Sequence, residues 1–238
     1  MIASLILLFS FVFFGFLVAV VFIPWSLITG NVTQLYIWAN WVVRLGLRLG
    51  GIRVVVVGRD KIPAAQSCIF LSNHVSNLDP LVLLPLIPGR TSIFLKRSLM
   101  KIPILGYAMR LGSFIPVDRG GSMEAARQSV QAAQSVIASG LHITTFVEGT
   151  RSKDGRLLPF KKGPFFLAKE TGAKCIPITI LGTETMMKKG SLRVTPGEAR
   201  VIFHPAINPA DYQSREALMV AVRKSIASVL PMERRSTI

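Results

Sequence analysis

Residues 71–80 of this chain read LSNHVSNLDP and place a histidine, His74, five positions before an aspartate, Asp79. An apolar, strand-like run precedes this stretch and a helix-like run follows it. On an ideal helix five residues turn through about 500°, so side chains five apart diverge by roughly 140°. The two side chains can therefore meet only if His74 lies on the incoming loop and Asp79 in the first helical turn. Ser76 or Asn77 suits the N-cap of such a helix, and Pro80 is tolerated in its first turn.

A histidine next to a carboxylate can act as a base. The carboxylate accepts one imidazole N–H, fixes the tautomer and leaves the other ring nitrogen able to take a proton. If the substrate brings its own hydroxyl group, no serine or cysteine nucleophile is needed. A simpler interpretation is also open, in which Asp79 is only an acid at a helix start and His74 only a loop residue. The choice between them depends on the rest of the chain.

Composition indicates a membrane-associated protein with a basic body. The chain has 238 residues, 50% of them hydrophobic, with a mean hydropathy of +0.50 and a formal net charge of +16. No charged side chain precedes Arg44, so all 28 Lys and Arg residues lie from there onward. This distribution favours an anionic bilayer surface and anionic substrates as partners. Nucleic acid is the competing partner, but no zinc-ligand spacing, aromatic RNA-binding signature or clear helix-turn-helix pattern supports it.

The two cysteines, Cys68 and Cys175, lie in apolar strand-like runs. This favours buried, reduced thiols in a cytoplasmic compartment over a disulfide or a metal site.

Residues 1–50 are predicted to form a membrane anchor of two helical segments. The first runs from Ile2 to Trp25, is almost wholly apolar and is long enough to cross a bilayer core. Pro24 and Gly30 are expected to interrupt it before a second segment over 33–49, in which two arginines share one helical face. Two arrangements fit: a full span followed by an interfacial helix, or a helical hairpin dipping into one leaflet. In either, the basic side should face the cytoplasm.

Residues 51–238 are predicted to form one α/β domain with a largely parallel central sheet flanked by helices. Short β-branched runs alternate there with helix-like ones, which is typical of such layers. The expected strands are 52–57, 67–71, 92–95, 113–117, 143–147, 175–180 and 200–204. The expected helices are 80–86, 104–111, 123–139, 164–171 and 215–229.

A second motif, FVEGTRS at 146–152, follows the expected strand 143–147. In an open α/β sheet, ligands bind at the carboxyl ends of the strands, where this loop should lie. Glu148 can accept from substrate hydroxyls, Gly149 allows close backbone approach, and Arg151 offers a planar fork for phosphate oxygens. A solvated turn with a local Glu–Arg pair is the alternative.

Other basic groups end strands in the same way. Arg119 follows the strand 113–117 and Lys96 ends the strand 92–95, so each could bind phosphate or simply neutralise a surface charge. His142 and His204 have no acid at a motif-like spacing and are expected to be structural. No metal-ligand spacing or phosphate-binding glycine loop occurs, and we expect neither a metal nor another cofactor.

Taken together, these residues resemble the 1-acyl-sn-glycerol-3-phosphate acyltransferases, a family of membrane-bound glycerolipid acyltransferases. The family's N-H-x4-D block is matched by Asn73, His74 and Asp79. Its glycine–strand–arginine block is matched by 112–119, and its F-P-E-G-T-R-S block by 146–152 with Val147 in place of proline. Its apolar-Pro-apolar block is matched by 176–178. The four blocks occur in order.

The resemblance implies acyl transfer from a thioester to the 2-hydroxyl of lysophosphatidic acid, giving phosphatidic acid for phospholipid biosynthesis. His74 would take the hydroxyl proton and Asp79 would orient and charge-stabilise the imidazole. The donor would be acyl-CoA or acyl-acyl carrier protein, and the enzyme would sit in the cell inner membrane with its catalytic domain facing the cytoplasm. The implied substrate-binding residues are Arg119, Glu148, Gly149, Thr150, Arg151 and Lys96.

Three rivals remain open. The acceptor could be another lysolipid or an acylated amino acid, because the first block reports only hydroxyl activation. Water could replace the hydroxyl in a membrane-anchored acyl thioesterase. A non-catalytic binder of anionic lipid is the third, and an intact His74–Asp79 pair argues against it.

Overall fold

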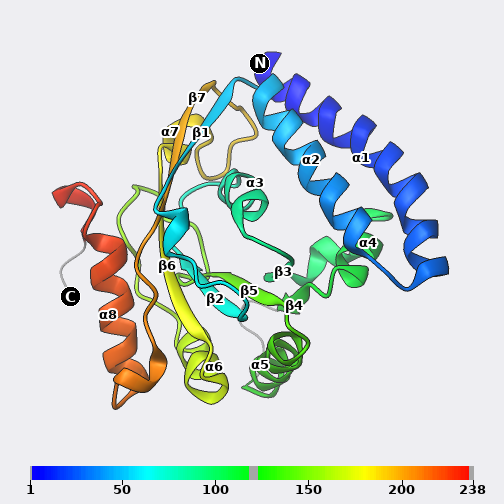
Figure 1. Ribbon diagram of the computed structural model, residues 1–238. Coiled ribbons are helices and arrows are strands. Elements are labelled where there is room, and N and C mark those ends of the chain that lie inside the picture. The colour runs from blue at the N-terminus through cyan, green and yellow to red at the C-terminus, as the bar shows by residue number, and fades with distance from the viewer. Residues whose placement is uncertain (1, 118–122, 236–238) are drawn as a thin grey trace.

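The computed structural model describes residues 2–117 and 123–235, which build a seven-stranded sheet with helices on both faces (Figure 1). The strand order is β1-β7-β6-β2-β5-β3-β4. The expected α/β architecture is confirmed, and every expected strand range overlaps one that forms. The strands are β1 (Ile52–Val57), β2 (Cys68–Ser72), β3 (Thr91–Lys96), β4 (Ile115–Val117), β5 (His142–Phe146), β6 (Lys174–Leu181) and β7 (Gly197–Phe203).

Five neighbouring strands, from β6 through β2, β5 and β3 to β4, run parallel to one another. Strand β7 runs antiparallel to β6, and β1 pairs parallel with β7, so these two strands point the other way. The carboxyl ends of β6, β2, β5, β3 and β4 therefore meet along one edge of the sheet. That edge is where an open α/β sheet places its ligands.

The two faces of the sheet bury alternate residues of the same strands. In β2, Cys68 and Phe70 belong to one apolar cluster and Ile69 and Leu71 to the other, and all four are fully buried. This follows from the two-residue period of a strand. Because both faces are covered, the central strands read as continuous apolar runs rather than as alternating ones.

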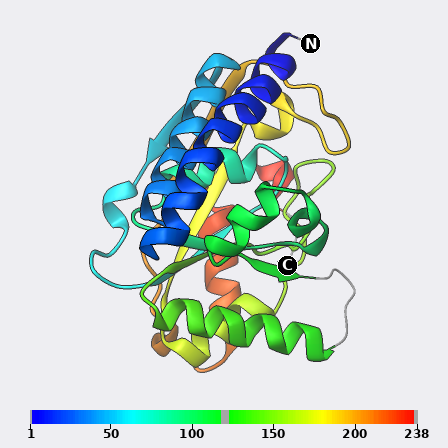
Figure 2. The ribbon, with the colours of Figure 1, turned by 90° about the vertical axis from the view of Figure 1, so that its right-hand side faces the viewer.

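Different helices cover the two faces, as Figures 1 and 2 show. The first cluster packs beneath α2 (Thr33–Leu49) and α3 (Asp79–Leu83), and the second beneath α5 (Met123–Ala138), α6 (Gly163–Thr171) and α8 (Arg215–Ala227). Two shorter helices, α4 (Leu105–Leu111) and α7 (Thr183–Met186), complete the helical layers. A 3-10 turn, η2 (Leu84–Leu86), continues directly from α3.

The N-terminal segment forms two helices that pack side by side, α1 (Ile2–Thr29) and α2. The expected interruption at Pro24 is wrong, because α1 continues through it to Thr29. Contacts with α2 hold α1 just before the proline, where the Phe22 ring stacks on Trp38. Just after it, the Ser26 hydroxyl donates to the Phe22 carbonyl at 2.6 Å. Packing against a neighbouring helix supports α1 as it continues past the proline.

The two helices differ in what they touch. Helix α1 is long and apolar enough to cross a membrane by length and composition, and most of its large apolar side chains are exposed. Helix α2 lies between α1 and the body, where Leu35, Val42 and Leu47 are buried. Gly46 lets the helices approach closely, since a Cβ there would meet the Phe11 ring at 2.7 Å. An exposed apolar helix of this kind indicates membrane association.

Candidate active site

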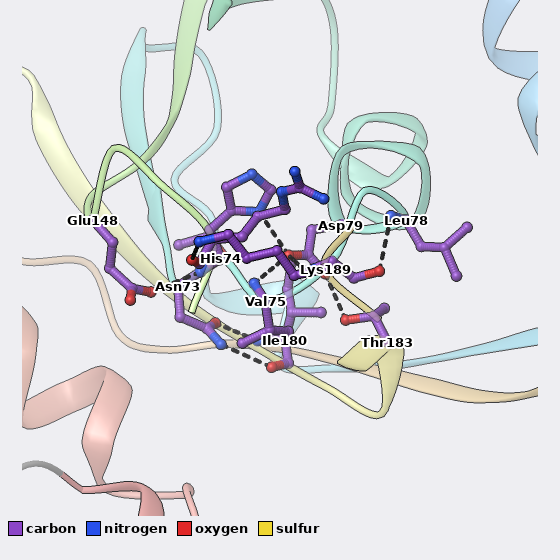
Figure 3. A network of polar contacts seen from close by, with 12 residues as sticks. Asn73, His74, Val75, Leu78, Asp79, Glu148, Ile180, Thr183 and Lys189 are labelled. Atoms are coloured by element: carbon purple, nitrogen blue, oxygen red, sulfur yellow. Dashed lines mark hydrogen bonds and ion pairs between the residues drawn. The ribbon is translucent and has the colours of Figure 1, made fainter. Parts of the chain in front are cut away.

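The site lies where β2 gives way to α3, at the carboxyl edge of the parallel strands. Asn73 and His74 follow β2 on a loop, and Asp79 is the first residue of α3. The Nδ1 atom of His74 lies 2.7 Å from Oδ2 of Asp79. The structure thus brings the two side chains together in the way that their spacing requires (Figure 3).

The start of α3 differs from the sequence expectation. Its N-cap is Leu78, with no side-chain cap, rather than Ser76 or Asn77. The Ser76 hydroxyl accepts the Leu78 N–H at 3.2 Å and donates to the Met187 carbonyl at 2.7 Å. The Asp79 carboxylate instead folds back onto the loop that precedes the helix. Its Oδ2 atom accepts the backbone N–H groups of Val75 at 2.7 Å and Ser76 at 2.8 Å.

Asp79 is fully buried and surrounded by donors. Besides the two backbone N–H groups and His74, the Thr183 hydroxyl donates to its Oδ1 atom at 2.5 Å. These contacts offset the cost of burying a carboxylate. They also hold it in one orientation, and that orientation holds the imidazole. Thr183 begins α7, just beyond β6, and its sequence surroundings gave no signal of this contact.

The His74 ring is fixed from a second side by the Phe146 ring. The two rings stack with centroids 4.1 Å apart and planes 19° from parallel. The His74 side chain keeps 11% of its surface exposed, and none of the described residues donates to or accepts from its Nε2 atom. With Nδ1 donating to Asp79, Nε2 carries the lone pair and is the atom able to accept a proton.

Asn73 ties the loop to the neighbouring strand. Its amide donates to the carbonyl of Ile180 at 2.9 Å, and its carbonyl oxygen accepts the N–H of Ile180 at 2.8 Å (Figure 3). The paired contacts lock the chain to β6 one residue before His74.

Glu148 clamps the same loop from the other side. Its Oε1 atom accepts the N–H of His74 and its Oε2 atom that of Leu158, both at 2.8 Å. Burial raises the pKa of this carboxyl to about 7, although both backbone hydrogen bonds oppose the shift. Each carboxylate oxygen already has a backbone partner, so in the structure Glu148 positions the loop that carries His74. Direct contact with a substrate hydroxyl stays a prediction.

Gly149 makes the turn that follows β5. Its φ is +66°, a left-handed conformation that favours glycine, and a Cβ there would meet the Lys161 side chain at 3.1 Å. Beyond the turn, the N–H of Ser152 donates to the carbonyl of His74 at 2.8 Å. The loop therefore passes directly beside the histidine, and Thr150 lies half-buried within it.

Arg151 is half-buried in this loop, and its Nη1 atom is buried with no partner among the described residues. The ammonium group of Lys189 donates to the Arg151 carbonyl at 2.6 Å and so holds the backbone that carries it. Figure 3 draws Lys189 with the polar network around His74 and Asp79. No sequence pattern pointed to Lys189, because it lies on the loop after α7, far away in the chain.

Of the two remaining predicted phosphate ligands, the structure describes only Lys96. Lys96 is exposed at the end of β3, on the same edge of the sheet as His74. Arg119 lies outside the described residues. The roles of Lys96 and Arg119 in substrate binding stay predictions.

The other histidines and the cysteines make contacts within the core. His142 Nδ1 accepts the N–H of Cys68 at 3.0 Å, and His204 Nε2 lies 2.8 Å from the Thr179 hydroxyl. Both cysteines are buried free thiols, and burial raises their pKa values, to about 11 for Cys68 and about 12 for Cys175. Thiols that hold their protons this firmly are poor nucleophiles.

Similar sequences among known proteins indicate the family to which this chain belongs. Residues 53–181 match the sequence profile of the family described as Acyltransferase. A 1-acyl-sn-glycerol-3-phosphate acyltransferase of Limnanthes douglasii is 31% identical over 196 residues, which cover 82% of this chain and 68% of that protein. A chloroplastic one of Brassica napus is 38% identical over 157 residues, 64% of this chain and 44% of that protein.

The fold has a counterpart among solved structures. The 1-acyl-sn-glycerophosphate (LPA) acyltransferase PlsC from Thermotoga maritima superimposes with a TM-score of 0.79 at 24% identity, covering 95% of this chain and 92% of that one. At this level of identity the likeness establishes the architecture.

Proposed function

This chain belongs to the acyltransferase family, and from that premise we propose that it acylates the 2-hydroxyl of 1-acyl-sn-glycerol-3-phosphate to form phosphatidic acid. The observation that carries the proposal is the His74–Asp79 pair. It is a buried carboxylate and a stacked imidazole whose Nε2 atom faces no described partner. The relatives named for this reaction support the choice of acceptor.

The residues support direct transfer with His74 as general base. His74 Nε2 takes the proton of the acceptor hydroxyl while the hydroxyl oxygen attacks the thioester carbonyl carbon. The carbon–sulfur bond then breaks, and the imidazolium returns its proton to the departing thiolate. Asp79 holds the Nδ1–H tautomer and stabilises the imidazolium between these steps. No acyl-enzyme is required.

Phosphate binding falls to the loop beside the base. Arg151 supplies a buried, unpartnered guanidinium nitrogen, and a guanidinium fork matches phosphate oxygens. Thr150 adds a hydroxyl and Lys96 adds positive charge at the end of β3, and Arg119, which follows the strand β4 in the sequence, is proposed to add another. Gly149 provides the turn that brings this loop against His74.

The helix pair supports a place at the membrane surface. Helix α2 packs on the body and α1 packs along α2, so the exposed apolar side chains of α1 move with the catalytic edge. This packing favours a hairpin dipping into one leaflet over a full span. We assign the catalytic side to the cytoplasmic face of the inner membrane, where acyl-CoA or acyl-acyl carrier protein delivers the thioester.

An in vitro assay with purified protein tests the proposal. Lysophosphatidic acid is supplied with each thioester donor in turn, and the products are identified by mass. We expect phosphatidic acid to form only when acceptor and donor are both present. Release of free fatty acid at the same rate without acceptor would instead identify a thioesterase. Equal turnover of acceptors that lack a phosphate would overturn the choice of substrate.

A further inference from the structure

A groove lies away from the catalytic pair, between α2, β1 and the far end of α3. Its volume is about 660 Å³, which is within the usual range for ligand sites. Figure 1 shows these elements on the face of the sheet that also carries α1. The lining residues are Arg44, Leu47, Arg48, Gly51, Ile52, Arg53, Val54, Leu81, Val82, Pro85 and Leu86.

The floor of the groove is apolar and firmly packed. Leu47, Ile52 and Val82 keep at most 3% of their surfaces exposed, so they belong to the core and form a fixed base. No acidic side chain is among the described residues that line it. Beside them in the lining, Val54, Leu81 and Leu86 are half-buried, and an alkyl chain laid against their exposed carbon would displace water, which is favourable.

Three arginines stand on the rim. Arg44 and Arg48 are exposed one turn apart on the same face of α2, and Arg53 is exposed on β1. Arg44 is held over the groove because its Nη2 atom donates to the Pro85 carbonyl at 2.6 Å. Arg53 Nε lies 3.8 Å from Glu198, but such long, exposed ion pairs contribute little and leave the arginine available.

The combination of a carbon floor and guanidinium rim fits an anionic amphiphile. A free phosphate would not use the floor, and an acidic protein would not need it. The neighbouring helix α1 exposes apolar side chains of the kind that meet lipid, so a bilayer is the nearest source of such a molecule. Leu81 and Val82 of α3 line the groove together with Pro85 and Leu86, but neither His74 nor Asp79 is among its described lining residues, so the groove is distinct from the catalytic pair.

We propose that this groove binds one anionic phospholipid, with its phosphate against the arginines of α2 and β1 and an acyl chain on the apolar floor. The site holds the protein to the acidic membrane surface independently of catalysis. Each rim arginine should strengthen binding about five-fold, the usual effect of one basic residue beside an anionic headgroup.

The test uses the full chain in neutral detergent micelles. Dioleoyl-phosphatidylglycerol or dioleoyl-phosphatidylcholine is titrated in, and bound lipid is counted from the mass of the intact complex. We expect the anionic lipid to bind with one-to-one stoichiometry and the zwitterionic lipid to bind more weakly. Replacing two rim residues, Arg48→Gln with Arg53→Gln, should weaken phosphatidylglycerol binding about 25-fold.

Two controls separate this site from folding and from catalysis. Arg59→Gln, an exposed arginine on the 3-10 turn η1 (Arg59–Lys61) outside the groove, should bind lipid as the unmodified protein does. The double variant should keep its acyl-transfer rate in detergent, and His74→Ala should keep its bound phosphatidylglycerol. The inference is overturned if the double variant binds like Arg59→Gln or if both lipids bind equally. Displacement of the lipid by millimolar inorganic phosphate would also overturn it.

Discussion

Two histidines that are buried to the same extent in this fold have different side-chain partners, and the partner decides what each imidazole can do. His74 is 8% exposed and His204 is 7% exposed, and each makes a short hydrogen bond to one side chain. The partner of His74 is the carboxylate of Asp79, whereas that of His204 is the hydroxyl of Thr179. Burial lowers the pKa of His204 to about 4, so that ring stays neutral.

The carboxylate changes what the His74 ring can do. An imidazole that takes a proton beside a carboxylate becomes half of an ion pair, but beside a hydroxyl it becomes an isolated buried charge. Asp79 can form this ion pair with His74 because Val75, Ser76 and Thr183 hold its carboxylate in place. His204 links β7 to the Thr179 hydroxyl, which in turn donates to the Ile226 carbonyl. The surroundings of His74 therefore suit proton transfer, whereas those of His204 suit packing.

Removing the charge of Asp79 should produce the largest change short of removing His74. In Asp79→Asn the side chain keeps its size, but the tautomer and the imidazolium lose their support. We expect kcat to fall about 10³- to 10⁴-fold with a KM for lysophosphatidic acid close to the original. Steady-state kinetics measure both constants. Asp154→Asn, an exposed acid on the adjoining loop, serves as the control and should change neither.

Loss of Arg151 should act on binding rather than on chemistry. We expect Arg151→Ala to raise the KM for lysophosphatidic acid about 10- to 100-fold, because a charge-assisted contact to phosphate is lost. The exposed Arg156 on the same loop is the matched control for a nonspecific loss of positive charge. If Arg156→Ala raised KM as much, the phosphate would not be bound specifically by Arg151.

Replacing Lys189 should raise the KM for lysophosphatidic acid less than replacing Arg151 does. Its ammonium group touches the backbone of Arg151, so Lys189→Met loosens the loop without removing the guanidinium. We expect a rise in KM of about three- to ten-fold and little change in kcat. Lys188→Met, beside it in the chain, should behave as the unmodified protein does. A large loss of kcat in Lys189→Met would show that Lys189 acts on the reacting atoms instead.

Glu148 and His204 should give opposite pH dependences of stability. The pKa of Glu148 is raised to about 7 in the fold, so between about pH 4.5 and 7 the folded state holds more protons than the unfolded state. Its contribution to the free energy of unfolding is present below that window and is lost as the pH rises through it. For His204 the unfolded state holds more protons between about pH 4 and 6.5, so its contribution is lost as the pH falls.

Thermal unfolding in neutral detergent across this range measures both effects. Glu148→Gln should remove a decrease in Tm between about pH 4.5 and 7. His204→Gln should remove an increase in Tm between about pH 4 and 6.5. Each effect should amount to about 3 kcal/mol, or roughly 6–12 °C in Tm. A change in the pH dependence of Tm, relative to the unmodified protein, that has the same sign in both variants would contradict these assignments.

Much of this architecture could be predicted because local sequence determines it. The run Ile52–Val57 forms a strand with the predicted bounds, since β-branched residues between Gly51 and Gly58 favour one. The meeting of His74 and Asp79 could be predicted because both lie within one short turn of chain. The reversed direction of β1 and β7 could not, because nothing within a strand encodes its direction relative to distant neighbours.

The partners of the site residues escaped prediction for a similar reason. Ile180 contacts Asn73 and Thr183 contacts Asp79, each across more than 100 residues of chain, and Lys189 contacts Arg151 on the loop after β5 across 38 residues. Two of these contacts use backbone atoms, which any residue type can supply. The path of α1 through Pro24 also depends on tertiary packing, which a local rule for proline does not include.

The partner of each buried histidine decides which ring acts as the base. The most direct test compares acyl transfer by purified His74→Ala and His204→Ala under one set of conditions. We expect His74→Ala to lose transfer to lysophosphatidic acid by at least about 10³-fold, and His204→Ala to keep its kcat at reduced thermal stability. Wild-type turnover by His74→Ala, or an equal loss in both variants, would contradict the account.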